Sequence, residues 1–318
     1  MSVFGPVPSR RLGRSLGINH VPPKTCTYSC IYCQLGRTSR MLSKRRAFYN
    51  PEEILERVEE RVVRAREGGE RLDYLTFVPD GEPTLDVNLG RAIELLKPLG
   101  VKTAVISNAS LIWRDDVRND LLDADWVSLK VDAVTDALWK RVNRPHGELD
   151  HEAILGGMRE FADIFEGELT TETMLIKGIN DDRGEVEGIA DFLTELRPDR
   201  TYIAVPTRPP AEDWVKFPDE GALNRAFQAF DSRLGRVEYL IGYEGDEFAF
   251  TGSLEDDLLS ITSVHPMREE GVRRLLSKAG SGWGQVERLI RERKLVEIEY
   301  QGKKFYLRKL PSLQTRTR

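Results

Sequence analysis

The chain has 318 residues, of which 40% are hydrophobic and 31% are charged, and its formal net charge is −5. This length fits one large and one small domain, and the mild charge does not by itself indicate a nucleic-acid partner. Apolar runs stay well below the length of about 20 residues that crosses a bilayer, and the N-terminus lacks the apolar core of a signal peptide. We therefore expect a cytoplasmic protein without membrane contact, whose thiols stay reduced.

The first expected element is a strand over residues 15–21, which a pair of prolines ends because proline cannot donate to a sheet ladder. All three cysteines of the chain follow it, at Cys26, Cys30 and Cys33, in a C-x3-C-x2-C pattern. This places them at the C-terminal end of a strand, the edge where α/β folds carry their chemistry. Thiolates are soft ligands that select iron–sulfur clusters, zinc or copper(I).

Three cysteines do not complete the usual four-ligand shell. A structural zinc ion takes four ligands, and a [4Fe–4S] cluster has four irons to ligate. On such a cluster, three cysteines would leave one iron open for a small molecule to bind and react. Two alternatives stay open. One is a zinc site completed by His20, and the other is a disulfide framework, against which an odd cysteine count without a secretory signal argues.

Basic residues surround the cysteines on both sides. This basic collar either attracts an anionic substrate or is a solvated face of a loop. Its members are Arg10, Arg11, Arg14, Arg37, Arg40, Lys44, Arg45 and Arg46.

Strand and helix patterns then alternate along the chain. After the first strand we expect strands over 74–78, 103–106, 126–131, 169–176 and 202–205. Helices are expected over 51–66, 89–96, 116–122, 136–142, 151–165, 184–196 and 219–234. Six strand–helix units predict an α/β fold with a parallel sheet and helical crossovers, and they are too few for a closed eight-stranded barrel.

The pattern changes at about residue 253. Two helices, over 266–278 and 282–293, precede a hairpin over 295–308, which is the order of a winged helix-turn-helix. The hairpin carries Lys303 and Lys304 where a wing would meet phosphate, although winged helices also dock proteins. We therefore predict two domains, 1–252 and 253–318, the second with a basic tail.

The cysteine spacing, with Tyr32 before the last cysteine, resembles the cluster loop of the radical S-adenosylmethionine (SAM) superfamily. The resemblance implies a partial (β/α)6 barrel and one [4Fe–4S] cluster on Cys26, Cys30 and Cys33, with SAM chelated to the open iron. It also implies that one electron, from a donor such as ferredoxin or flavodoxin, cleaves SAM to a 5′-deoxyadenosyl radical that takes hydrogen from a substrate.

Residues 5–36 and the run Gly81-Glu82-Pro83-Thr84-Leu85 resemble the branch of wyosine-type tRNA-modifying synthases and their uncharacterised relatives. Those synthases carry a second cluster on three further cysteines, which this chain lacks. A tRNA base is the leading expectation for the substrate. A protein or small molecule, with the winged helix as docking module, is the alternative. An iron–sulfur redox sensor that regulates transcription is a third, which the six-unit α/β half disfavours because a sensor needs no SAM site.

The resemblance also implies that SAM lies across the C-terminal ends of the strands. Residues 80–83 resemble a Gly-Gly-Glu-Pro segment whose backbone holds the SAM amino group, with Asp80 in place of the first glycine. The expected SAM contacts are Gly81, Glu82, Pro83, Ser107, Asn108, Lys130, Asp132, Glu172 and, against the adenine, Val205. Lys130 either pairs with the SAM carboxylate, acts catalytically as an amine nucleophile, or forms an ion pair with Asp132 or Glu172. Arg208 is expected to face the substrate.

Overall fold

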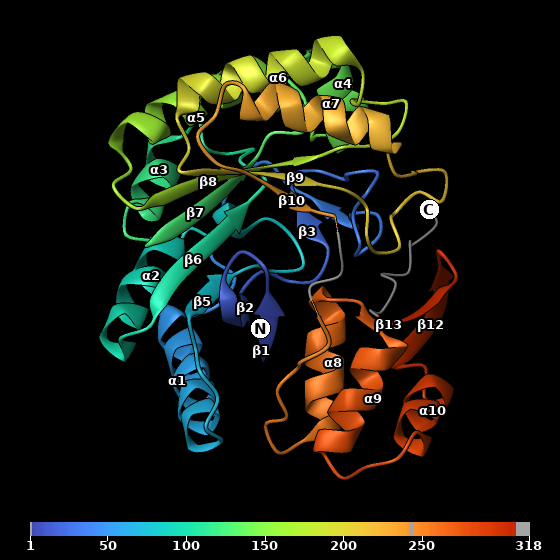
Figure 1. Ribbon diagram of the computed structural model, residues 1–318. Helices are drawn as coiled ribbons and strands as arrows, with labels where there is room; N and C mark the ends of the chain where they lie inside the picture. The colour runs from blue at the N-terminus through green and yellow to red at the C-terminus, as the bar shows by residue number, and fades with distance from the viewer. Residues whose placement is uncertain (1, 242–244, 310–318) are drawn as a thin grey trace, which may run out of the picture.

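The structure, a computed structural model, describes residues 2–241 and 245–309 (Figure 1). Within these residues one eight-stranded sheet has the order β1-β2-β5-β6-β7-β8-β9-β10. The first strand pairs antiparallel with the second, and every later pair is parallel. The strands are β1 (Ser2–Ser9), β2 (Gly13–Asn19), β5 (Tyr74–Phe77), β6 (Lys102–Ser107), β7 (Trp126–Lys130), β8 (Glu168–Met174), β9 (Arg200–Ala204) and β10 (Val237–Leu240).

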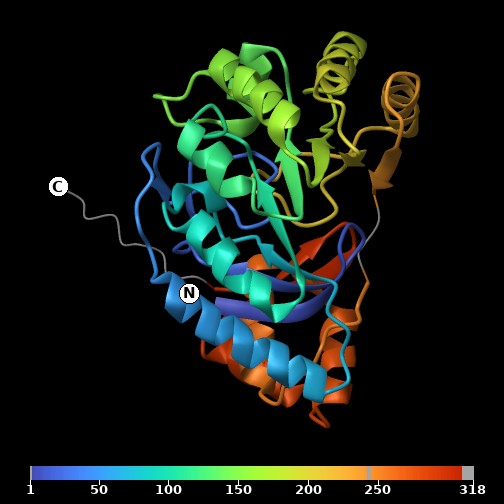
Figure 2. The ribbon, with the colours of Figure 1, turned by 90° about the vertical axis from the view of Figure 1, so that its left-hand side faces the viewer.

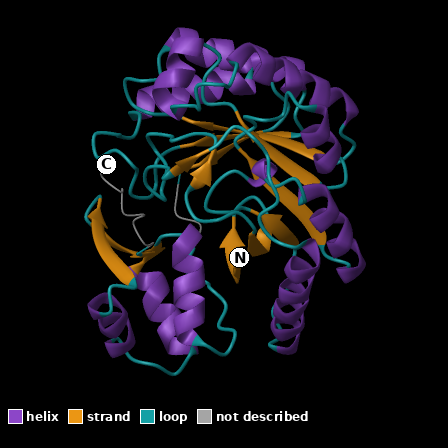
Figure 3. Cartoon of the chain, turned by 180° about the vertical axis from the view of Figure 1, so that it is seen from behind, coloured by secondary structure: helices purple, strands orange, loops and turns teal. Residues whose placement is uncertain are grey.

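Helices cover the outer face of the curved sheet (Figures 1 and 3). They are α1 (Pro51–Glu67), α2 (Leu89–Leu96), α3 (Asp115–Leu121), α4 (Asp136–Asn143), α5 (His151–Ile164), α6 (Arg183–Leu196) and α7 (Glu220–Asp231). Four of them begin at a side chain that caps a free backbone N–H, from Asn50, Asp150, Asp182 and Asp219. Their apolar faces join the strands in one core, which includes Ile54 and Ile189 of the helices and Leu75 and Val127 of the strands.

The predicted mixed α/β fold is confirmed, and all six predicted strands are present as β2 and β5–β9. Two further strands of the eight-stranded sheet were not predicted. β1 contains Pro6 and Pro8, which a strand at the edge of a sheet tolerates because it is paired on one side only. β10 follows α7 and adds a seventh parallel strand.

The C-terminal unit, residues 245–309, lies beside the β1 edge of the sheet (Figures 1 and 2). It contains α8 (Leu254–Val264), β11 (Met267–Arg268), α9 (Glu269–Lys278), α10 (Gly284–Arg291), β12 (Leu295–Tyr300) and β13 (Lys303–Arg308). Its strands form an antiparallel sheet in the order β11-β13-β12. The predicted basic tail, 313–318, lies outside the described residues.

The C-terminal unit shares a core with the N-terminal strand. Phe4 and Val7 of β1 pack with Phe248, Leu258 and Tyr306 in one cluster of buried residues. The two predicted domains are therefore joined through β1, and the boundary at residue 252 stays a prediction. None of the described helices has both the length and the apolar composition of a membrane span.

Candidate active site

The cysteine loop begins at the C-terminal end of β2, where β3 (Thr25–Cys26) pairs with β4 (Arg40–Met41). Backbone hydrogen bonds fix its start against the loop that follows β5. Lys24 N donates to Asp80 O at 2.8 Å, and Glu82 N donates to Thr25 O at 3.2 Å. The two neighbouring strand ends thus hold the loop of Cys26 at the edge of the sheet where the sequence predicted it.

All three cysteines are free thiols, and burial raises the pKa of each, that of Cys30 to about 12. Two amide side chains point at the sulfur atoms. Asn108 Nδ2 lies 3.5 Å from Cys26 Sγ, and Asn143 Nδ2 lies 3.4 Å from Cys30 Sγ. Such N–H groups stabilise the negative charge of thiolates that ligate iron. The donor set therefore fits an iron–sulfur cluster, with three thiols that lose their protons only when metal binds.

The structure does not bring His20 together with the cysteines. Its ring is buried, with Nε2 at 3.3 Å from Pro83 O and an edge against Phe77, and burial lowers the pKa of His20 to about 4. Among the described residues, no group of three or more His, Cys, Asp or Glu side chains could hold a single metal ion. A cluster differs from one ion because each cysteine ligates a different iron.

The loop after β5 packs tightly on the start of the cysteine loop. A Cβ atom on Gly81 would lie 1.7 Å from Thr25 O, so this position requires glycine. The buried carboxylate of Glu82 accepts hydrogen bonds from Ser107 Oγ at 2.7 Å and Asn108 N at 2.8 Å. Burial raises the pKa of Glu82, and these hydrogen bonds oppose the rise. Glu82, Ser107 and Asn108 thus join two strand ends, and their contact with SAM stays a prediction.

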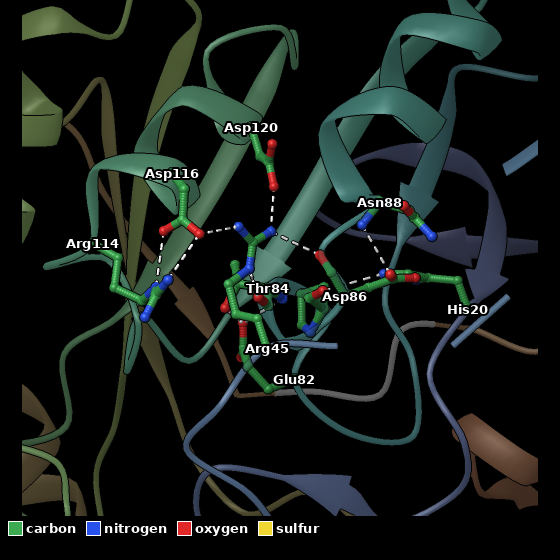
Figure 4. A network of polar contacts seen from close by, with 10 residues as sticks. His20, Arg45, Glu82, Thr84, Asp86, Asn88, Arg114, Asp116 and Asp120 are labelled. Atoms are coloured by element: carbon green, nitrogen blue, oxygen red, sulfur yellow. Dashed lines mark hydrogen bonds and ion pairs between the residues drawn. The ribbon is translucent and has the colours of Figure 1, made fainter. Parts of the chain in front are cut away.

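Arg45 clamps the same loop from the other side (Figure 4). Its buried guanidinium donates to Thr84 O and Asp86 O, both at 2.8 Å, and pairs with Asp116 and Asp120 of α3. The sequence placed this residue in the basic collar, but the structure uses it to hold the segment that follows Pro83.

At least half of the basic collar is engaged within the protein. Carboxylates pair with four of its eight members: Arg11 with Glu172, Arg14 with Glu70, Arg37 with Glu212, and Arg45 with Asp116 and Asp120. Arg40, Lys44 and Arg46 are exposed. The collar therefore contributes less free charge than its sequence indicates.

Asp132 anchors the aromatic residue of the cysteine loop. Its Oδ2 accepts from Tyr32 OH and, at 2.8 Å, from Asn143 Nδ2, while Oδ1 accepts from Met174 N at 2.9 Å. Asn143 therefore contacts both Asp132 and the sulfur of Cys30. No sequence pattern indicated this role for Asn143, which lies at the end of α4. Asp132 holds the cysteine loop, and its predicted contact with SAM stays a prediction.

Lys130 forms an ion pair with Glu172, one of the two partners that the sequence analysis considered. Its Nζ lies 2.8 Å from Glu172 Oε1 and 4.7 Å from the centre of the Tyr32 ring. Burial opposes the charge on Lys130, but the carboxylates of Glu172 and Asp132 together outweigh it and raise the pKa of Lys130. The pKa of Glu172 falls to about 2, because Lys130 and Arg11 outweigh burial. An amine nucleophile must be unprotonated, so this pair disfavours the catalytic role, which stays a prediction.

A cavity of about 260 Å³ lies beside Cys33. It brings together three of the predicted SAM contacts, Lys130, Glu172 and Val205, with Arg208. Ser107, Asn108 and Asp132 are not among its lining residues. The cavity extends from the cysteine loop to the segment after β9.

Asp80, which replaces the first glycine of the expected segment, is buried with both carboxylate oxygens lacking a hydrogen-bond partner among the described residues. Burial raises the pKa of Asp80 from 3.8 to about 7, against the charges of Arg308 and Lys24. The native protein therefore binds this proton more tightly than the unfolded chain. The contribution of this proton to the free energy of unfolding is fully present below about pH 4 and is lost as the pH rises through 7.

We expect Asp80→Asn to remove this pH dependence, because an amide does not titrate. Between pH 5 and pH 8, this group should lower the free energy of unfolding of the cofactor-free wild type by about 2 to 3 kcal/mol, since one pKa unit corresponds to about 1.4 kcal/mol. The variant should not show this loss. Urea unfolding at both pH values measures the loss, with the exposed Asp213→Asn as control. Equal pH slopes in wild type and Asp80→Asn would contradict the expectation.

Known proteins are similar to part or nearly all of the chain. The radical SAM superfamily matches residues 21–193. UPF0026 protein MJ1312 of Methanocaldococcus jannaschii is 46% identical over 311 residues, which cover 97% of this chain and 96% of that protein. A UPF0026 protein of Helicobacter pylori strain J99 is 36% identical over 210 residues, 65% of this chain and 67% of that protein.

Solved structures are similar to part of this chain. A radical SAM methyltransferase from Sphaerobacter thermophilus superposes with a TM-score of 0.56 at 20% identity, covering 71% of this chain and 66% of that one. Archaeal TYW1 gives a TM-score of 0.46 at 15% identity, covering 70% and 72%. The resemblance drawn from the cysteine loop is thus confirmed: the chain belongs to the radical SAM superfamily and, within it, to the UPF0026 family.

Proposed function

We propose that Cys26, Cys30 and Cys33 hold the [4Fe–4S] cluster that radical SAM enzymes use, and that SAM and the substrate share the cavity beside Cys33. One observation carries the proposal: three free thiols lie at the carboxyl edge of a parallel sheet, and Cys33 among them lines a cavity that polar side chains at the strand ends also line. When bound, the cluster supplies the electron that cleaves SAM to methionine and a 5′-deoxyadenosyl radical, which takes hydrogen from the substrate.

The chain's own residues divide into two sets in this proposal. Asp132 and Asn143 hold the cysteine loop through hydrogen bonds with Tyr32 and Cys30, and Glu82 holds the start of the loop through its backbone N–H, which donates to Thr25 O. Lys130, paired with Glu172, offers its charge to the SAM carboxylate, and Val205 offers an apolar surface to adenine. The enzyme needs an electron donor, for which a small cytoplasmic redox protein such as ferredoxin or flavodoxin is our candidate.

We also infer a winged helix over residues 254–308, next to a partial (β/α) barrel. The order of three helices and a final hairpin, with the sheet order β11-β13-β12, supports the winged helix. Because the superfamily consists of enzymes, we no longer retain the transcription-sensor alternative.

The charges of the C-terminal unit favour a small molecule or protein over a tRNA base as substrate. On and beside α10, Arg288 and Lys294 both pair with Glu255 and with Glu292. These pairs neutralise cations that would otherwise meet nucleic-acid phosphates. In the hairpin, Tyr300 OH donates to Pro206 O at 2.9 Å, so the wing contacts the catalytic half.

Reductive cleavage of SAM tests the proposal. Anaerobically reconstituted protein should hold about four irons per chain and, with dithionite and SAM, release 5′-deoxyadenosine. Bulk tRNA should leave the rate unchanged. Iron-loaded protein that releases no 5′-deoxyadenosine would refute the proposal, and stimulation by tRNA would restore a tRNA base as the substrate. Truncation at residue 252 is unsuitable for this test, because it would expose Phe4 and Val7.

A further inference from the structure

Positive charge is concentrated in the part of the chain that contains the cysteine loop. Residues 1–51 include nine lysines and arginines and neither Asp nor Glu, although the whole chain has a net charge of −5. The rest of the chain is therefore strongly acidic. The segment 36–46, which we call the basic strip, directly follows the cysteines and contains five of these cations, Arg37, Arg40, Lys44, Arg45 and Arg46.

The basic strip lies alongside the start of the cysteine loop. Its strand β4 pairs with β3, and Met41 stands opposite Cys26 in this pair. Neighbouring strands lie about 4.8 Å apart, so the backbone of the strip is one strand spacing from that of a cysteine. Arg40 stands opposite Thr25, and Arg40 is exposed whereas Thr25 is buried. The strip therefore presents its cations to solvent next to the thiols.

Two arginines of the strip keep their charge free of protein carboxylates. Arg40 and Arg46 are exposed, and their side chains form no ion pair or hydrogen bond within residues 2–241 and 245–309. Arg37 and Arg45 differ from them, because Arg37 pairs with Glu212 and Arg45 pairs with carboxylates of α3. Exposed charge of one sign that is not neutralised attracts partners of the opposite sign.

The basic strip and the cavity lie on different sides of the cysteine loop. Cys33 lines the cavity, whereas Cys26 and the residues of the strip are not among its lining residues. The cations of the strip are therefore not needed by a ligand in the cavity. A macromolecule that docks on the strip leaves the cavity open to SAM and the substrate.

We propose that the basic strip is the docking surface for the electron donor, and that this donor is a small carrier protein with an acidic surface. The inference rests on the proposed function, because only a cluster on the three cysteines needs this electron. One electron passes from the reduced cofactor of the carrier to the cluster. The carrier is oxidised by one electron and the cluster is reduced by one, and no bond forms or breaks in this step.

The position and the size of the strip both suit such a partner. Electron transfer through protein slows steeply with distance, so the carrier must dock where the surface is close to the cluster. Complexes between redox proteins are small and short-lived, and opposite charges mainly accelerate and orient the encounter. A few exposed cations beside Cys26 therefore suffice for the task.

A nucleic acid fits the strip less well. Tight binding of a phosphate backbone usually needs six or more cationic contacts, about one for each counterion released. The strip has only two arginines free of carboxylates, and in the C-terminal unit Glu255 pairs with both Arg288 and Lys294. The charges therefore favour a protein with acidic side chains.

Binding of carrier proteins to the iron-loaded protein tests the docking surface. An acidic flavodoxin and an acidic ferredoxin, both oxidised, are titrated in separate arms under anaerobic conditions, and calorimetry measures the affinity. We expect saturable binding of at least one of them. The affinity should fall about tenfold as the ionic strength rises from about 0.05 M to about 0.5 M. Because this chain and the probes are all negative overall, a general charge effect would have the opposite sign.

The combined substitution Arg40→Gln and Arg46→Gln should weaken the complex about tenfold and remove most of its salt dependence. Arg225→Gln combined with Arg236→Gln is the matched control. Both arginines are exposed and outside the strip, and their side chains have no ion pair among the described residues. This control removes the same charge and should leave the affinity within about twofold of wild type. The rate of 5′-deoxyadenosine release with the reduced carrier, divided by the rate with dithionite, should fall only in the first variant.

Three results would overturn the docking surface: no binding of either carrier, equal weakening in the two double variants, or binding that strengthens with salt. Bulk tRNA is titrated in a further arm. Loss of tRNA binding in the Arg40 and Arg46 variant, with carrier binding unchanged, would also overturn the inference and assign the strip to RNA. Protein that cleaves SAM with dithionite but binds no carrier refutes this inference alone. Protein that binds a carrier through the strip but does not cleave SAM refutes the proposed function.

Discussion

Replacing Cys30 with alanine is expected to abolish reductive cleavage of SAM, with a loss on the order of a thousandfold or more, because two cysteines cannot hold a cluster that needs three. The fold should survive the change. Burial raises the pKa of Cys30 to about 12, so the metal-free thiol is neutral and its removal strands no buried charge. Iron and sulfide content and 5′-deoxyadenosine release, measured anaerobically with dithionite, test the expectation.

Ser29→Ala is the matched control for Cys30→Ala. Ser29 is the preceding residue of the loop, and its Oγ accepts one hydrogen bond from Thr38 N at 3.2 Å. Losing that single bond should leave iron content and cleavage within about threefold of wild type. Wild-type cleavage by Cys30→Ala would place the reacting centre elsewhere. Wild-type protein with one zinc and no iron would instead revive the zinc alternative.

The local sequence pattern predicted the inner strands of the large sheet, but it did not predict β1 and β10, which lie at the two edges of that sheet. Strands buried on both faces, such as β5 and β7, are short runs of mostly apolar, β-forming residues and are easy to recognise. β1 carries Pro6 and Pro8, which in isolation indicate a loop. Only its place beside β2, with one edge unpaired, makes these prolines acceptable, and its burial under α8 depends on residues about 250 positions away.

The site shows the same division between local and distant information. The three cysteines are recognisable because their spacing is local. The contacts of Asn143 with Cys30 and of Tyr32 with Asp132 join residues about 100 positions apart, and no local pattern encodes them. Arg45 is the clearest case: sequence proximity to other cations indicated a collar, while the fold surrounds it with carboxylates of α3. Composition predicts charge, but only topology decides which charges are neutralised.

Gly81→Ala is expected to prevent cluster assembly through steric displacement of the cysteine loop. Its Cβ would lie 1.7 Å from Thr25 O and 2.7 Å from Thr25 C, and backbone atoms cannot rotate away as a side chain can. The two segments must separate, which breaks the bond from Glu82 N to Thr25 O. Because Cys26 follows Thr25, one thiol moves with them. We expect iron content below about a tenth of wild type and a stability loss of about 3 kcal/mol in urea unfolding.

Gly147→Ala is the control that separates this contact from a general effect of adding a methyl group. Gly147 also lies in a loop beside the cysteine loop, because the preceding residue, His146, donates its backbone N–H to Thr27 O at 2.9 Å. A Cβ atom on Gly147 would meet nothing within 4 Å. This variant should load iron as wild type does. If Gly81→Ala also kept its iron but lost SAM binding, the close approach to Thr25 would be tolerated. The glycine would then be required at the SAM amino group, as the family's segment implies, and not for holding Cys26 in place.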